Sequence, residues 1–187
     1  MTIFGNRLFT IRLQLRRIEA QDLQLLAEWS NDPLAYGDHL TPKNYSVEEL
    51  NVQLQAGVLW SERHKTFLIE LRDGTPIGTV QYWIRAEEPE TAVMAIKIAR
   101  PEERCKGYGV EAQKYLVLFL FSRLSIHRVD MYTDVNNAAQ QRCLQKLGFS
   151  QVQALPYADH QVQRLGYLYR LGRQQFVNQP IYQHHYE

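Results

Sequence analysis

The sequence predicts an α+β fold with a mixed, mostly antiparallel sheet flanked by helices. Three observations predict it: apolar and polar residues alternate near the start, three strand-like segments follow one another in the middle, and strands alternate with helices in the second half. The last pattern requires one parallel crossover. At 187 residues with 45% hydrophobic and 22% charged residues, the chain can bury a core of its own, so one domain over residues 1–187 is expected.

The first third of the chain predicts a strand and two helices. Ile11, Leu13 and Leu15 alternate with polar residues, as in a half-buried strand. A helix begins near Asp22 and ends before Pro33, because the residue before a proline disfavours helical geometry. Residues 46–49 have the S-x-x-E spacing of a capping box, which predicts a second helix from there to about residue 56.

The rest of the chain predicts an antiparallel meander followed by the mixed segment. The expected strands are residues 65–71, 77–84, 92–99, 127–135, 149–154 and 166–171, and the expected helices are residues 108–124 and 137–147. Gly148 provides the C-cap of the last helix. From Gln174 the composition turns to Gln, Asn, His and Tyr, so residues 174–187 are expected to form a surface extension and not a core element.

Composition excludes several functional classes. With 21 Lys+Arg against 20 Asp+Glu, bulk attraction to nucleic acid or to an acidic membrane cannot drive binding, so neither is an expected partner. No stretch approaches the roughly 18 apolar residues of a membrane span, and the first ten residues lack a signal-peptide core, so a cytoplasmic protein is expected. Cys105 and Cys143 are too few for a disulfide framework or a zinc site.

The histidines also predict no metal site. None of them form an H-x-x-x-H pair, so surface or structural roles are expected for His39, His64, His127, His160, His184 and His185.

The segment with the clearest chemical signal is residues 96–110, where a strand runs through a short loop into a helix. The Arg104-x-x-Gly107-x-Gly109 spacing places two glycines where the main chain can bend and approach a ligand closely. Free amides and the positive end of the helix dipole would together attract an anion such as a pyrophosphate. A tight turn before a core helix is the alternative interpretation.

Two common phosphate-binding motifs do not fit this loop. A Walker loop requires a Lys-Ser/Thr pair after its second glycine, and Gly109 is followed by Val110 and Glu111. A dinucleotide-binding fingerprint requires a third glycine, where this chain has Ala112. That fingerprint also follows the first strand of its fold, whereas three expected strands precede this loop.

The loop resembles the Q/R-x-x-G-x-G/A signature of the GNAT superfamily of acetyl-CoA-dependent N-acetyltransferases. The similarity extends over residues 15–17, 22–23, 28–33, 107–112, Asn137 and 146–149. It is greatest to the branch that acetylates ribosomal-protein N-termini, which also includes spermidine and antibiotic acetyltransferases. The resemblance implies a sheet that splays between its fourth and fifth strands, with the pantetheine arm of acetyl-CoA in the gap. It also implies direct transfer of acetyl to a primary amine.

The resemblance carries over a set of acetyl-CoA-binding residues. Backbone groups of the fourth strand would meet the acetyl and pantetheine amides, the glycine loop would wrap the pyrophosphate, and Asn137 would hold the pantetheine or order its own loop. Asn137 also fits a plain helix N-cap. The complete set is Lys97, Ile98, Ala99, Arg104, Cys105, Lys106, Gly107, Tyr108, Gly109, Val110 and Asn137.

The sequence departs from the family at the general acid. The two positions where family members carry a tyrosine or a serine for this task are Leu144 and Gln140 here. Tyr132, on the strand before Asn137, is the candidate catalytic acid, with wall packing as its alternative role. Cys143 fits a buried structural cysteine better than a reactive thiol.

The sequence identifies no general base either, and this bears on which amine is the acceptor. At neutral pH a lysine or polyamine amine is only about 0.04% neutral, whereas an α-amine is about 14% neutral and reacts with less help. A protein or peptide N-terminus is therefore the expected acceptor. A polyamine or other small amine, or a degenerate acyl-CoA-binding module without turnover, are the alternatives.

Overall fold

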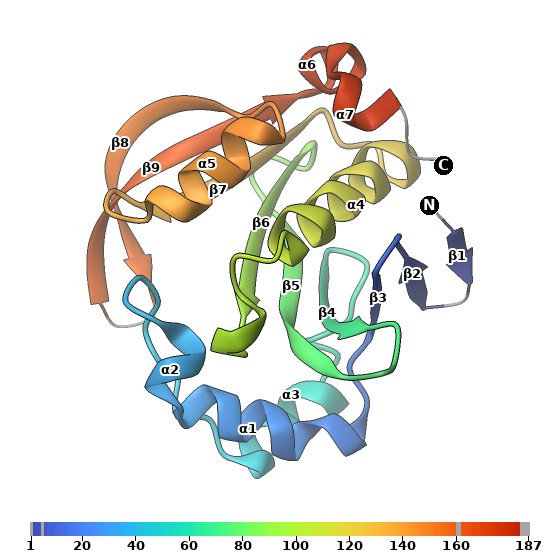
Figure 1. Ribbon diagram of the computed structural model, residues 1–187, viewed down its shortest axis with the longest axis vertical. Helices are drawn as coiled ribbons and strands as arrows, with labels where there is room; N and C mark the ends of the chain where they lie inside the picture. Colours follow the sequence, from blue (N-terminus) through green and yellow to red (C-terminus); the bar gives the residue numbers. More distant parts are fainter. Residues whose placement is uncertain (1, 5, 160–161, 184–187) are drawn as a thin grey trace.

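The computed structural model describes residues 2–4, 6–159 and 162–183, and its strands form one continuous sheet (Figure 1). His160, His184, His185 and the end of the expected extension, residues 184–187, lie outside the described residues. The sheet has nine strands in the order β1-β2-β3-β4-β5-β6-β7-β9-β8. In this described part all strand pairs are antiparallel except β6 with β7, so the expected mixed, mostly antiparallel α+β sheet is confirmed.

The elements follow the predicted order, with additions at both ends. The strands are β1 (Thr2–Phe4), β2 (Arg7–Phe9), β3 (Leu13–Arg17), β4 (His64–Leu71), β5 (Pro76–Ile84), β6 (Thr91–Ile98), β7 (Arg128–Asp134), β8 (Ser150–Asp159) and β9 (Val162–Gly172). The helices are α1 (Leu23–Asn31), α2 (Pro33–Tyr36), α3 (Val47–Gln55), α4 (Tyr108–Arg123), α5 (Ala138–Lys146), α6 (Arg173–Asn178) and α7 (Pro180–Gln183), with short 3₁₀ turns η1 (Ala20–Asp22) and η2 (Pro101–Glu103).

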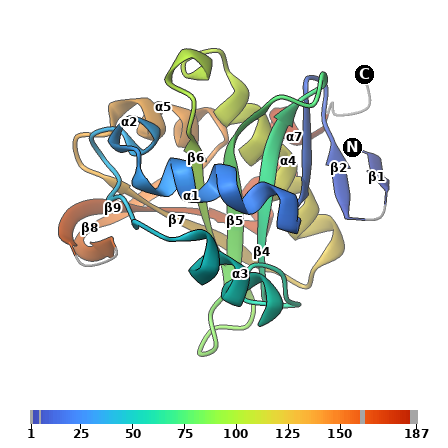
Figure 2. The same cartoon turned by 90° about the horizontal axis from the view of Figure 1, so that it is seen from below.

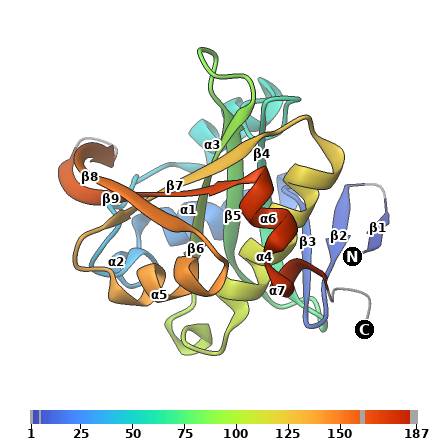
Figure 3. The same cartoon turned by 90° about the horizontal axis from the view of Figure 1, so that it is seen from above.

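Helices cover both faces of the sheet. Viewed from below, α1, α2 and α3 lie in front of the central strands, and viewed from above, α4 and α5 lie on the opposite side (Figures 2 and 3). The larger hydrophobic cluster joins α4 to the sheet, whereas a smaller one lies under α1 and α3. The expected capping box at α3 is present, since Ser46 and Glu49 each accept a hydrogen bond from the other's backbone amide.

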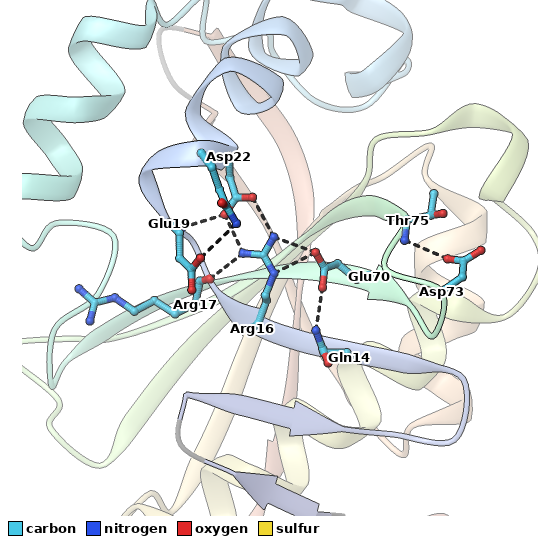
Figure 4. Close-up of polar contacts among 9 residues, drawn as sticks. Gln14, Arg16, Arg17, Glu19, Asp22, Glu70, Asp73 and Thr75 are labelled. Carbon is cyan, nitrogen blue, oxygen red and sulfur yellow. Dashed lines mark hydrogen bonds and ion pairs between the residues drawn. The ribbon is translucent and has the colours of Figure 1, made fainter.

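A buried ion cluster fixes α1 against the sheet (Figure 4). The Arg16 guanidinium on β3 donates to both Asp22 oxygens, at 2.7 and 2.8 Å, and to Glu70 on β4 at 2.9 Å. Asp22 also accepts from the Glu19 amide at the start of η1. Because these groups satisfy each other's charge and hydrogen bonds, the first helix begins at a defined place over strands β3 and β4.

The sheet splays between β6 and β7. These strands pair in parallel only where Thr91, Ala92 and Val93 meet Arg128, Val129 and Asp130. Beyond that point β6 continues to Ile98 and β7 to Asp134, so the two strands leave a gap between their carboxyl ends. The splay expected from the family resemblance is confirmed.

The C-terminal segment folds as two short helices. Residues 173–183 form α6 and α7, most of whose residues are exposed, and aromatic side chains anchor these helices to the rest of the molecule. Phe176 stacks on Phe121 of α4 with ring centroids 4.5 Å apart, and Tyr182 is 3% exposed and donates a 2.8 Å hydrogen bond to the Leu147 carbonyl. Among residues 174–183 only Tyr182 is buried, so most of the described part of the expected extension lies at the surface, folded as two short helices.

No helix among the described residues is long and apolar enough to cross a membrane.

Candidate functional site

The loop between β6 and α4 leaves its backbone amides free. Cys105 and Gly107 adopt left-handed backbone conformations, with φ of 60° and 84°. Within the described part of the chain no acceptor faces the amides of Cys105, Lys106 and Gly107, and the first turn of α4 has no intrahelical acceptors for its own amides. The Lys106 carbonyl points elsewhere and accepts a 3.0 Å hydrogen bond from Arg12. Such a run of N–H groups at a helix start is a site for an anion.

Arg104 lies behind this loop and holds it in place. Its guanidinium donates to the carbonyls of Ile98 at 3.0 Å, Leu34 at 2.5 Å and Ala35 at 3.1 Å. The first residue of the signature therefore joins the loop to the end of β6 and to α2. Arg104 is among the expected acetyl-CoA-binding residues, and in the structure its guanidinium contacts these three carbonyls of the chain itself.

Glu111 fixes the loop from the opposite side. Its carboxylate accepts hydrogen bonds from the Thr10 hydroxyl at 2.5 Å and from the Arg12 amide and Nε, both at 2.7 Å. Burial raises the pKa of Glu111, but the hydrogen bonds from Thr10 and Arg12 outweigh burial, so the pKa lies below its usual value. Lys106, expected near a phosphate, is exposed and pairs with Glu103 at 2.9 Å.

The end of β6 offers fewer free backbone groups than the sequence predicted. The Ala99 amide donates to the Ile77 carbonyl of the β5 side, and the Ile98 carbonyl is occupied by Arg104. Ala99 is therefore removed from the groups that can meet a ligand through their N–H. Because amides alternate in direction along a strand, the Ile98 amide faces away from β5, toward the gap.

A cavity of about 720 Å³ opens beside the splay, and residues of α1, α2 and α3 form part of its lining. Central strands, the loop after α2 and the β8–β9 hairpin line it. Of the predicted residues, Lys97, Tyr132, Asn137 and Gln140 line this cavity. The glycine loop does not, because it lies toward α4, where the Ile96 and Ile98 side chains come within 4.0 Å of the position that a Cβ on Gly109 would take.

Tyr132 faces the cavity from β7. Its ring stacks on Tyr157 of β8 with centroids 6.1 Å apart, and its hydroxyl accepts a hydrogen bond from the Arg85 guanidinium. Since Arg85 occupies an acceptor lone pair, the phenolic proton is left available for donation. Arg85 also pairs with Glu88 at 3.5 Å and with Asp130 at 3.8 Å.

The start of α5 is organised by amide side chains. Asn137 is an N-cap that accepts from the Gln140 amide at 3.1 Å, as its alternative role predicted. Gln140 donates to Gln113 of α4, which in turn donates to the Cys143 sulfur at 3.0 Å. Burial raises the pKa of the Cys143 thiol to about 11, which agrees with a structural cysteine.

Sequence reasoning missed several residues of the cavity. Thr133 follows Tyr132 on β7, and its buried hydroxyl has no partner among the described residues. His39, expected in a surface or structural role, lines the cavity with its Nδ1 3.8 Å from Asp134. Asp134 and Asp159 both lie within 3.6 Å of Arg164. Only the fold brings these residues together, and no local motif marks them.

The comparison with known families decides what this arrangement is. The acetyltransferase (GNAT) domain family matches residues 12–150. The chain belongs to the GNAT family. The GNAT signature loop, the splay and the free amides of this chain fit acetyl-CoA as the co-substrate, and the protein is an acetyl-CoA-dependent acetyltransferase.

Individual relatives agree with this assignment. A Bacillus subtilis (strain 168) protein described as the uncharacterized N-acetyltransferase YoaA is 31% identical over 146 residues, which are 75% of this chain and 80% of that protein. The structure of AAC(6')-Ib with ribostamycin and coenzyme A superimposes with a TM-score of 0.75 at 22% identity, over 90% of this chain and 98% of the other. A putative ribosomal-protein-serine acetyltransferase from Vibrio cholerae gives 0.70 at 24% identity, over 90% and 98%. These two structures share the GNAT fold with this chain.

Proposed function

We propose that this GNAT enzyme transfers acetyl from acetyl-CoA to the α-amine of a protein or peptide N-terminus. The observation that carries the proposal is the charge of the cavity. Both of its carboxylates, Asp134 and Asp159, are paired with Arg164, at 3.6 and 3.0 Å. One guanidinium offsets only one of the two carboxylates, but Lys43 and Lys97 also line the cavity, so these five groups sum to +1. An acceptor with several positive charges, such as a polyamine or an aminoglycoside, would find no net negative charge there.

The binding residues support a defined position for the donor. The free amides of Cys105 to Val110 would bind the pyrophosphate, and the Ile98 amide and the Thr133 hydroxyl would meet the pantetheine arm in the splay. Asn137, as an N-cap, would order the end of β7 beside that arm. Holding donor and acceptor in one orientation supplies a large share of the rate in such a transfer.

The reaction then needs two proton transfers. The neutral amine attacks the thioester carbonyl, an N–C bond forms, and the C–S bond breaks with the electron pair leaving on sulfur. Tyr132 would donate its proton to the departing thiolate, and Arg85 would stabilise the resulting phenolate. His39, held near Asp134, would accept the proton that the amine loses.

A comparison of acceptors tests the proposal. Thiol release from acetyl-CoA is followed with unstructured peptides that have a free N-terminus, with the same peptides blocked at the N-terminus, with spermidine and with kanamycin. We expect the highest kcat/KM for the free N-terminus, with the acetyl group located on the α-nitrogen by mass spectrometry. Turnover of spermidine or kanamycin alone would contradict the proposal.

A further inference from the structure

Two lysines face the acceptor cavity without an acidic partner. Lys43 belongs to the loop between α2 and α3, and Lys97 lies near the end of β6. Neither takes part in any ion pair of the described residues, whereas both Asp side chains of the same cavity share the single guanidinium of Arg164. Three positive and two negative groups give this part of the cavity a net charge of 3 − 2 = +1, and the two lysines are the positive groups without an acidic partner.

These charges lie on the acceptor side of the sheet. Side chains alternate between faces along a strand, and Ile96 and Ile98 point toward α4. Lys97 therefore points to the opposite face, toward α2, where its Nζ lies 3.9 Å from the centre of the Tyr36 ring. The glycine loop that would hold the diphosphate is on the α4 side, so Lys97 is not placed to bind it.

The charge of Lys43 acts on Lys97. Burial, together with the positive charges of Lys43 and Arg104, lowers the pKa of Lys97 to about 8. Burial also lowers the pKa of His64, and Lys43 adds to that effect. Like charges that share a partly buried cavity repel, and an anion placed between them would relieve this repulsion.

The loop that carries Lys43 is anchored on both sides. The Thr41 amide donates to Asp159 of β8 at 2.7 Å, and the Tyr45 amide donates to the Ser30 hydroxyl of α1 at 2.9 Å. The Tyr36 side chain contacts both lysine residues. Its ring lies against the Lys97 ammonium, and its hydroxyl accepts a hydrogen bond from the Lys43 backbone. Burial raises the pKa of the Tyr36 hydroxyl, and the hydrogen bond opposes that rise. The positive charges are thus held in place before a ligand arrives.

We propose that Lys43 and Lys97 bind a carboxylate on the acceptor, so that the preferred acceptor combines a primary amine with a nearby acidic group. The proposal rests on acetylation of an α-amine, as in the proposed function, and names the acidic group that accompanies this amine. The carboxylate has two sources: an acidic side chain next to a peptide N-terminus, or the α-carboxylate of a free amino acid. Either would place its amine toward the splay while the carboxylate contacts the lysines.

Matched acceptors separate the two sources. One pair consists of peptides that differ only in Asp or Asn at the second position, and the other pair is alanine and alaninamide. We expect kcat/KM to be at least about tenfold higher for the acidic member of one pair, a factor that corresponds to about 1.4 kcal/mol. The pair that shows the preference identifies the source of the carboxylate.

A charge reversal tests the role of the lysines. In Lys43→Glu we expect the preference to disappear or to reverse toward a peptide with Lys at the second position. Lys114→Glu makes the same change on α4, outside the cavity lining, and is expected to keep the wild-type preference. Calorimetry with acetyl-CoA alone should give the same Kd for all three proteins, and circular dichroism should show that they are folded.

Three results would overturn the inference. Equal kcat/KM within both acceptor pairs would show that no carboxylate is recognised. An unchanged preference in folded Lys43→Glu would place the recognition elsewhere. A weaker Kd for acetyl-CoA in Lys43→Glu but not in Lys114→Glu would assign the lysines to the donor. Acetylation of neutral peptide N-termini would continue in all three cases, so the proposed function is tested separately.

Discussion

The Arg12 guanidinium lies 2.7 Å from the Glu111 carboxylate and joins the chain just before β3 to the first turn of α4. Through the same side chain Arg12 holds the Lys106 carbonyl at 3.0 Å, and its guanidinium lies over the Tyr108 ring at 4.6 Å. A pair nearly 100 positions apart in sequence therefore orients the loop whose amides remain free. The conformation of this loop depends on strand β3 as much as on its own glycines.

Acid should weaken this contact. Because the pKa of Glu111 is lower in the folded protein than its usual value of 4.5, its contribution to stability is present above that value and is lost as the pH falls through the folded-state pKa. We expect Glu111→Gln to be less stable than wild type at neutral pH, with the difference shrinking below pH 4.5. Urea unfolding at several pH values measures this. Glu102→Gln, at an exposed ion pair, is the control, and a difference that does not vary with pH would contradict the argument.

Gly107 is the position where bulk should interfere most with the donor. Its φ is +84°, and a Cβ there would lie 3.2 Å from the Arg12 guanidinium, beside the free amides. We expect Gly107→Glu to weaken acetyl-CoA binding at least about tenfold, because a carboxylate would repel the diphosphate at close range. Calorimetry gives the Kd directly.

Gly74 provides a matched control for that substitution. Its φ of +88° imposes the same backbone strain, but nothing lies within 4 Å of its Cβ position. Gly74→Glu should therefore lose comparable stability and keep the wild-type Kd. An unchanged Kd in Gly107→Glu would refute the placement of the diphosphate at this loop.

Local patterns in the sequence predicted the loop and most of the sheet, because the glycine spacing and the alternation of apolar residues lie within a few positions of one another. The residues around the acceptor could not be found in this way. His39 and Asp134 are 95 positions apart, and they approach only after the loop beyond α2 folds against β7. Leu144, which stands at one of the two positions where family members carry the acid, is fully buried.

The anchoring of the C-terminal segment could not be predicted from its composition. Polarity from residue 174 onward predicts exposure, and most of the described residues there are exposed. Phe176 and Tyr182 nevertheless pack with ring centroids 4.8 Å apart, and Tyr182 is buried. Such a contact depends on where the chain returns to the fold and not on the average polarity of the segment.

Tyr132 should affect turnover and not donor binding. If its phenol protonates the departing thiolate, Tyr132→Phe removes that proton and should lower kcat by about 10²–10⁴-fold. The Kd for acetyl-CoA should stay within about twofold of wild type, because the ring and its stacking on Tyr157 remain. Steady-state kinetics with a peptide acceptor, together with calorimetry, separates the two effects.

Tyr157→Phe is the control for that experiment. It removes a hydroxyl from the stacked neighbour in the same cavity, so a nonspecific loss of polarity would lower kcat in both variants. A normal kcat in Tyr132→Phe would leave Tyr132 as wall packing, and the thiolate would then take its proton from water.

The ion cluster under α1 should be a major contributor to stability. The Arg16 and Asp22 side chains are only 9% and 8% exposed. Asp22→Asn therefore removes one of the two carboxylates that pair with the Arg16 guanidinium, at a site with little access to water. Removing one partner of a buried pair typically costs about 3–5 kcal/mol. Asp73→Asn, in the exposed turn drawn in the same close-up, should cost far less (Figure 4). Equal losses of unfolding free energy in urea would show that Arg16 is satisfied by Glu70 and water.

Lys97 should make stability rise with pH in a defined window. Its pKa falls from a usual 10.5 to about 8 in the folded protein, because burial and the charges of Lys43 and Arg104 disfavour the ammonium. Between these values the unfolded chain binds more protons than the folded one, so the free energy of unfolding increases with pH. Below pH 8 the Lys97 side chain is charged in both the folded and the unfolded state, and the burial of this charge then destabilises the folded state most strongly.

Lys97→Met removes this cost while keeping an unbranched side chain of similar length. We expect the variant to be more stable than wild type at neutral pH, and we expect its advantage to shrink steadily as the pH rises from 8 toward 10.5. Urea midpoints at matched pH values measure the difference, with Lys114→Met reporting the effect of losing a lysine from α4. An advantage that is constant across this range would mean that Lys97 keeps its proton in the folded protein. Contacts around the Lys97 ammonium, such as the Tyr36 ring, would then stabilise the charge by more than burial destabilises it.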